Sequence, residues 1–134
     1  MEILVNIDVD DLEKALSFYV AAFGLEVGRR FGPDGVELRK GSAPIYLLAK
    51  AGGSPASSRS TQVRSYQRHW TPVHLDFVVD DVEVAVATAR SAGAELEDEV
   101  ETHPWGRIAY MADPFGHGFC LIQFLGRGYD EIAS

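Results

Sequence analysis

The stretch VDDLEKAL at residues 9–16 returns 70 residues later as VDDVEVAV at residues 79–86. Residues before the two stretches also match in pairs: Ile3 with Val73, Asn6 with Asp76, and Ile7 with Phe77. Self-similarity at a fixed offset indicates repeated structural units. The sequence therefore predicts two modules in tandem.

Each module is predicted to begin with a strand and continue into a helix. Apolar residues alternate with polar ones over residues 2–9 and again over residues 73–79, the pattern of half-buried strands. Asp10 and Asp80 follow these strands, each with a glutamate three residues later, which is the arrangement of a capping box. We expect a helix to start at each of these two aspartates.

Short strands are predicted to complete each module. They cover residues 27–31, 35–39 and 44–49 in the first module, and residues 95–100, 107–112 and 118–124 in the second. The predicted fold class is α+β, with two βαβββ modules in one domain of residues 1–134. Its expected parts are module one at 1–53, a linker at 54–70, module two at 71–125 and a tail at 126–134.

Composition excludes several classes of protein. The chain has 134 residues and a formal net charge of −8, which disfavours a nucleic-acid partner. No apolar run reaches the roughly 20 residues that span a bilayer, and the first residues lack the pattern of a secretion signal, so we expect no membrane partner. Cys120 is the only cysteine, which fits a reducing compartment and predicts a cytoplasmic location.

The repeated pattern resembles the vicinal oxygen chelate superfamily, which includes glyoxalase I, extradiol dioxygenases, and fosfomycin- and bleomycin-resistance proteins. The resemblance rests on Val9-Asp10-Asp11-Leu12, Phe18-Tyr19, Phe23-Gly24-Leu25, His74, Val79-Asp80-Asp81, Ala92-Gly93-Ala94 and Asp113-Pro114-Phe115-Gly116. It implies the glyoxalase/bleomycin resistance/dioxygenase fold, in which paired modules line a half-barrel cleft. It also implies a homodimer.

The resemblance further implies where a metal would bind. Metal-dependent members carry a His five residues before the Val of the first motif and a Glu seven residues after the Asp of the second. His74 matches this pattern, but Leu4 and Cys120 replace two of the ligands, and Tyr46 is a poor donor in the last strand of module one. A catalytic divalent ion usually takes three protein donors. We therefore expect no cofactor, although Ni, Zn, Mn or Fe on His74 and Cys120 stays an alternative.

The strand faces turned away from the helices are expected to carry the ligand site. Amide and carboxylate groups on such a face need partners, because burying them unpaired costs several kcal/mol. The candidate ligand-binding residues are Asn6, Asp8, Tyr46, His74, Asp76, Trp105 and Cys120.

Structural roles compete with these assignments. His74 could be a core histidine bonded to Asp76 or to a backbone carbonyl. Cys120 behaves by default as a small buried apolar residue, and Trp105 could belong to the core or to a dimer interface. Arginines 59, 64 and 68 could simply belong to the linker, or could close over an anion.

Two functions are compatible with the sequence. The first is a glyoxalase- or bleomycin-resistance-like protein that binds a small molecule in its cleft without the full metal set. The second is an enzyme of the same superfamily: a metal-dependent lyase, isomerase or dioxygenase using His74 with an atypical ligand set. In the enzyme, His74 and Asp76 are also candidates for acid–base catalysis.

Overall fold

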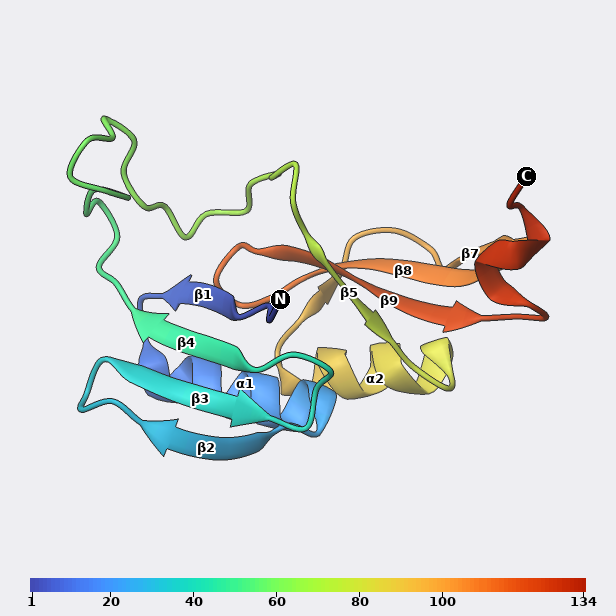
Figure 1. The fold of residues 1–134 in the computed structure, drawn as a ribbon, viewed down its shortest axis with the longest axis horizontal. Helices are drawn as coiled ribbons and strands as arrows, with labels where there is room; N and C mark the ends of the chain where they lie inside the picture. Colours follow the sequence, from blue (N-terminus) through green and yellow to red (C-terminus); the bar gives the residue numbers. More distant parts are fainter. The chain divides into compact units, whose positions relative to one another are not determined.

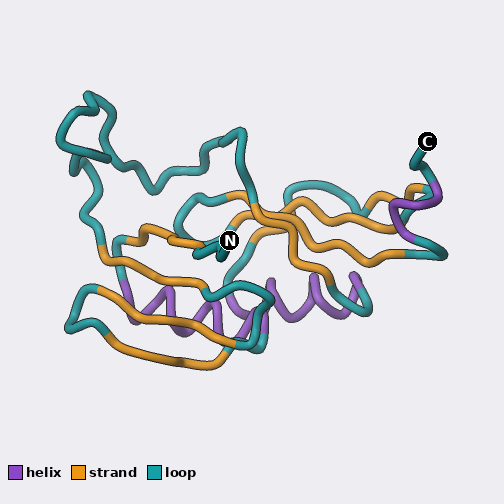
Figure 2. Tube along the Cα trace, viewed as in Figure 1, coloured by secondary structure: helices purple, strands orange, loops and turns teal.

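The computed structural model describes residues 1–134, which form two compact units, Met1–Gln67 and Arg68–Ser134. Each unit holds one sheet and one long helix (Figures 1 and 2), so the α+β class and the tandem modules are confirmed. Between the last strand of the first unit and the first strand of the second there is no helix or strand, apart from one isolated bridge between Pro55 and Val63. No helix combines the length and apolar character needed to cross a membrane.

The N-terminal unit contains a four-stranded sheet in the order β1-β4-β3-β2. Its elements are β1 (Val5–Val9), α1 (Leu12–Phe23), β2 (Glu26–Arg30), β3 (Gly35–Arg39) and β4 (Ile45–Ala49). Strand β1 runs parallel to β4, whereas the other neighbours are antiparallel. Helix α1 packs against β3 and β4 and buries Leu12, Ala15, Leu16, Phe18 and Tyr19.

The C-terminal unit repeats this plan in a sheet ordered β5-β9-β8-β6. Its elements are β5 (Leu75–Val78), α2 (Val82–Ala92), β6 (Glu95–Leu96), β7 (Glu101–His103), β8 (Gly106–Ala112), β9 (Gly118–Phe124) and the short 3-10 helix η1 (Gly128–Glu131). The single strand predicted for residues 95–100 was wrong, because two short strands, β6 and β7, pair with different parts of β8. Helix α2 packs against β6, β8 and β9.

Both helix starts lie one residue later than predicted. Asp11, not Asp10, caps α1 by accepting from the backbone N–H of Lys14, and Asp81, not Asp80, caps α2 by accepting from that of Val84. An N-cap side chain reaches the N–H of the third helical residue. The glutamates after each cap therefore stand one position too early to complete a capping box.

The first strand of each module is shorter than the alternation predicted. Ile3 and Val73 lie before β1 and β5 and are 67% and 82% exposed, so neither belongs to a buried strand face. The ladders begin only where a partner is available: Val5 lies opposite Ile45, and Leu75 lies opposite Phe119. Alternation continues in the sequence beyond the point where backbone pairing stops.

A hairpin turn connects β8 to β9. The buried carboxylate of Asp113 accepts from the backbone N–H of Phe115 at 2.8 Å and from that of His117 at 2.9 Å, and Gly116 supplies the positive φ of 84° that the turn needs. The turn aligns Gly118 with Ala112 and so sets the register of the longest ladder in the unit.

Candidate functional site

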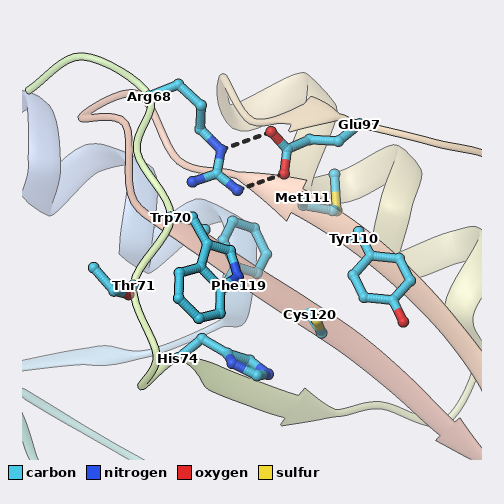
Figure 3. A pocket seen from close by; sticks show the side chains of 10 residues that line it. Arg68, Trp70, Thr71, His74, Glu97, Tyr110, Met111, Phe119 and Cys120 are labelled. Carbon is cyan, nitrogen blue, oxygen red and sulfur yellow. Dashed lines mark hydrogen bonds and ion pairs between the residues drawn. The ribbon is translucent and has the colours of Figure 1, made fainter.

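A pocket of about 100 Å³ lies in the C-terminal unit (Figure 3). Its lining comes from the segment before β5, from the residue after β6, from β8 and from β9: Arg68, Trp70, Thr71, His74, Glu97, Tyr110, Met111, Gly118, Phe119 and Cys120. Pockets that enclose a whole ligand usually measure roughly 300–1,000 Å³. This pocket is therefore large enough for one chemical group of a ligand rather than for a complete molecule.

Strand pairing places three ionisable side chains in one row across the sheet. Asp76 of β5 lies opposite Cys120 of β9, and Cys120 lies opposite Tyr110 of β8. Residues directly opposite one another in a ladder point to the same face. His74, two residues before Asp76, joins them on that face, and its Nε2 lies 3.2 Å from Asp76 Oδ1.

His74, Asp76 and Cys120 form a compact cluster of possible ligand atoms. One nitrogen, one carboxylate oxygen and the sulfur lie within 4.8 Å of one another. The sequence left open that His74 is a core histidine bonded to Asp76. His74 does contact Asp76, but its side chain is 49% exposed, so it is not a core residue. Cys120 is 4% exposed, so it does occupy the core of the sheet.

Burial raises the pKa of the two ionisable groups, Cys120 and Tyr110, that share this row with Asp76. Burial, reinforced by the nearby Asp76 carboxylate, raises the pKa of the Cys120 thiol to about 12. Burial also raises the pKa of Tyr110, with smaller contributions from Glu101, Cys120 and Asp76. At neutral pH the thiol is therefore protonated and donates its hydrogen to Asp76.

An ion pair forms one wall of the pocket. Arg68 Nε and Nη2 donate to the two carboxylate oxygens of Glu97 at 2.6 and 2.7 Å (Figure 3). This hydrogen bonding lowers the pKa of Glu97 and raises that of Arg68. A Cβ at position 118 would stand 2.7 Å from Arg68 Nη2, so Gly118 provides the space in which the guanidinium lies on β9.

The N-terminal unit has an equivalent row with different chemistry. Asn6 lies opposite Tyr46, and Tyr46 lies opposite Glu37. Glu37 is 4% exposed and accepts from Arg29, from Arg39 and from the Tyr46 hydroxyl. The hydrogen bonds from Arg29 are the main reason why the pKa of Glu37 lies far below its usual range.

Sequence reasoning missed Glu37 and its two arginines as a polar cluster. The available signal was alternation, because Glu37 stands between the apolar Val36 and Leu38 in a predicted strand. Its side chain therefore had to leave the apolar face and share the face of Tyr46. Alternation also places Arg39, two residues along the same strand, on that face. Arg29 had no comparable signal, because its contact depends on the pairing of β2 with β3.

Asp8 and Trp105, the two other candidates, do not line the pocket. Asp8 pairs with Arg64 at 2.6 Å, in the N-terminal unit. Trp105 stacks on His103 at 5.3 Å between ring centroids and also contacts the rings of Phe124 and Tyr129. Trp105 further packs against the buried cluster that contains Cys120, so it supports this row of residues without lining the pocket.

The linker arginines are largely engaged with carboxylates. Arg64 is held by Asp8 and by Ser54, and Arg68 is held by Glu97. Neither of these two guanidiniums is poised to close over an anion, because each already has a carboxylate partner.

The four-ligand metal set that the family resemblance implies does not fit this chain. In the N-terminal unit the corresponding positions hold Leu4, which has no donor atom, and Tyr46, whose hydroxyl donates to Glu37 and accepts from Arg29. The residues that could hold a metal are instead confined to the C-terminal unit. They are His74, Asp76 and Cys120.

Comparison with known proteins confirms the resemblance seen in the motifs. A family model described as a glyoxalase-like domain matches residues 4–122. An uncharacterized protein of Mycobacterium bovis is 35% identical over 121 residues, which cover 86% of this chain and 78% of that protein. The anthracycline biosynthesis protein DnrV of Streptomyces peucetius is 30% identical over 132 residues, which cover 97% of this chain and 43% of DnrV.

Solved structures share the fold. The fosfomycin resistance protein FosX from Listeria monocytogenes superposes with a TM-score of 0.73 over 99% of this chain and 98% of its own, at 18% identity. At that identity the likeness concerns the fold, and function must be argued from the site.

Proposed function

Because this chain belongs to the family of glyoxalase-like domains, we propose that it binds a small organic molecule through the pocket of its C-terminal unit, without the full metal set of the family. The observation that carries this proposal is the convergence of polar and aromatic groups at one place. His74 and Cys120 line the pocket beside Asp76, and Trp70 and Tyr110 provide flat apolar surface around them. A few polar groups within apolar walls are typical of ligand sites.

The pocket chemistry indicates a planar group that carries a hydrogen-bond donor or a positive charge. Trp70 is 78% exposed and offers an open ring face, which attracts flat groups and cations. The cation on the pocket wall, Arg68, is already paired with Glu97, so the carboxylate of Asp76 dominates the local charge. Because the pocket has room for only one chemical group, the rest of the ligand lies outside it.

A ligand-induced stability measurement tests this function. We would screen planar aromatic amines, and include an anthracycline because of the name of the relative DnrV. A ligand at 100 times its Kd stabilises the folded state by about 2.7 kcal/mol, which raises the Tm by several degrees. Asp76→Asn should abolish most of the rise, whereas the control Glu101→Gln, which changes another histidine-paired carboxylate outside the pocket, should retain it.

Fluorescence locates the ligand. The chain has two tryptophans, of which Trp70 lines the pocket and Trp105 does not. A bound ligand should quench the tryptophan fluorescence of the wild-type protein. In Trp70→Phe most of this quenching should disappear. Stabilisation and quenching that survive both Asp76→Asn and Trp70→Phe would place the ligand elsewhere and refute the proposal.

A second candidate function is a metal-dependent lyase, isomerase or dioxygenase. The observation in its favour is the proximity of the His74, Asp76 and Cys120 donor atoms. A bound divalent ion would act as a Lewis acid on substrate oxygens, and His74 beside Asp76 is placed to hold or move a proton. Turnover that depends on added metal and on His74, with the screened amines failing to bind, would favour this enzyme over the binding protein.

The assembly and location proposed with this function follow from family resemblance and composition. We propose a cytoplasmic homodimer with no nucleic-acid or membrane partner. Light scattering during size-exclusion chromatography measures the mass directly, and a species at the 14.7 kDa of one chain across micromolar concentrations would contradict the dimer.

A further inference from the structure

We propose that Arg29 and Arg39 bind the carboxylate of a small aromatic acid on the sheet of the N-terminal unit. The two arginines belong to β2 and β3, and they share no residue with the pocket of the C-terminal unit. The two places select opposite charges, since the pocket presents a carboxylate and this surface presents two guanidiniums. The inference therefore goes beyond the proposed function, and either can fail without the other.

A β-bulge directs Arg29 to this face of the sheet. The register of β2 against β3 shifts between Val27 and Arg30, so Gly28 and Arg29 together stand opposite Glu37 of β3. Bulges re-aim side chains and are common beside functional sites. A Cβ on Gly28 would stand 2.4 Å from Glu37 Oε1, so the glycine leaves room for that carboxylate.

The buried carboxylate of Glu37 holds the two guanidiniums next to each other. Its Oε2 accepts from Arg29 Nη2 at 2.6 Å, and its Oε1 accepts from Arg39 Nε at 2.8 Å. The Tyr46 hydroxyl and the backbone N–H of Arg29 also donate to it. Both carboxylate oxygens are therefore engaged, and Glu37 keeps the two arginines in place for a further partner.

The cluster has an excess of positive charge on a chain whose formal net charge is −8. Two guanidiniums face the single carboxylate of Glu37, so one positive charge is left uncompensated. The other nearby carboxylate, Glu26, lies opposite Arg39 in the ladder but is paired with Lys40. Like charges at this separation repel, and an anion that bridges the two guanidiniums would relieve the repulsion.

Both guanidiniums keep N–H donors that no group of the chain uses. Arg39 is held only through Nε, so its two terminal nitrogens have no partner within the chain. Arg29 is held through Nε and Nη2, which leaves Nη1. The side chains are 61% exposed for Arg29 and 58% exposed for Arg39, so a ligand can reach them. The planar fork of a guanidinium matches the two oxygens of a carboxylate.

An exposed ring beside the arginines favours an aromatic acid over an aliphatic one. Phe31 is 46% exposed, and its ring centroid lies 5.6 Å from Arg29 Cζ. It also lies 6.1 Å from the ring of Tyr46. A ligand whose carboxylate meets the guanidiniums can place its own ring against Phe31 in an offset or edge-to-face contact.

Titration with benzoate tests the proposal, followed through the arginine Nε–H signals in ¹H–¹⁵N NMR spectra at constant ionic strength. Benzoate should shift the signals of Arg29 and Arg39 to saturation and bind at least threefold more tightly than acetate. Arg39→Gln should weaken benzoate binding at least tenfold, while Arg29 remains to neutralise Glu37. The matched control is Arg30→Gln, which removes a neighbouring guanidinium that pairs with Glu13 and should leave the titration unchanged.

The alternative outcomes would overturn the site. Equal weakening by Arg39→Gln and Arg30→Gln would show general charge attraction, and tighter binding of inorganic phosphate than of benzoate would contradict the aromatic carboxylate. If Arg39→Gln fails to fold, Arg39→Lys decides, because it keeps the charge, loses the planar fork and should also weaken binding. Asp76→Asn should not alter benzoate binding, although it abolishes most amine binding in the proposed function; benzoate binding lost in Asp76→Asn would refute the separate site.

Discussion

The turn between β8 and β9 yields the sharpest stability prediction. Asp113 is 5% exposed, and one of its carboxylate oxygens accepts two backbone hydrogen bonds, from Phe115 and from His117. Asp113→Ala removes the carboxylate, so the backbone N–H groups of Phe115 and His117 both lose their acceptor. The first of these donors is buried and the second is partly buried.

The expected loss follows from these two bonds. A hydrogen bond to a charged group contributes about 1.5–3 kcal/mol, and a buried donor left unpaired costs about 1–3 kcal/mol. Since the second donor can be partly rehydrated, we expect Asp113→Ala to destabilise the C-terminal unit by about 2–4 kcal/mol. For a unit of this size, that lowers the Tm by on the order of 10–20 °C.

The assay uses the position of the two tryptophans. Trp70 and Trp105 both belong to the C-terminal unit, so their fluorescence follows the unfolding of that unit. Asp113→Asn is the matched control, because it keeps an oxygen acceptor of the same shape and should cost clearly less than Asp113→Ala. The reasoning is refuted if Asn destabilises as much as Ala, or if Ala lowers the Tm by less than 3 °C.

Three further predictions concern the same unit. Gly106→Ala places a Cβ 2.4 Å from the Gln123 carbonyl oxygen, in the backbone of β9. This overlap should lower the free energy of unfolding by about 1–3 kcal/mol. An unchanged Tm in thermal unfolding would show that the strands separate freely. Glu97→Gln should cost about 0.5–1 kcal/mol at pH 7, since the Arg68 pair is partly exposed. The hydrogen bonds from Arg68 hold the folded pKa of Glu97 below the usual 4.5, so this contribution is complete above pH 4.5 and is lost as the pH falls through the lowered pKa. The urea midpoints of wild type and variant should therefore converge at acidic pH, and a constant gap would contradict the pairing. Cys120 is 4% exposed and should react with a disulfide reagent only after denaturant is added, whereas rapid labelling of native protein would show an open site.

Local patterns predicted the order of elements well, because each depends on neighbours in the chain. The repeated VDD stretch identified the strand-to-helix junctions, and Gly24 and Gly93 of the family motifs do lie at the helix ends. The cap residue was misplaced by one because Asp10 and Asp11 are both good acceptors, and only the helix geometry selects between them.

Contacts between strands were less accessible from sequence. The pairing of Asp76 with Cys120 could be expected only by analogy, and it became specific once the β5–β9 register was known. The contact of Arg29 with Glu37 depends on the irregular pairing of β2 with β3, for which the sequence carries no local signal. Arg39, in contrast, reaches Glu37 from two residues along the same strand. Tertiary pairing, rather than propensity, determines such contacts.

The two equivalent rows also imply different tolerance to mutation. In the N-terminal unit, Glu37 and Tyr46 hydrogen-bond to each other, so a change at either disturbs a polar network centred on a buried carboxylate. In the C-terminal unit, Tyr110 is 41% exposed, and His74 is also open to solvent, so changes there alter what the surface presents. A mutational scan that scores protein abundance and ligand capture separately should therefore divide along the internal repeat, with abundance losses in the first copy and capture losses in the second.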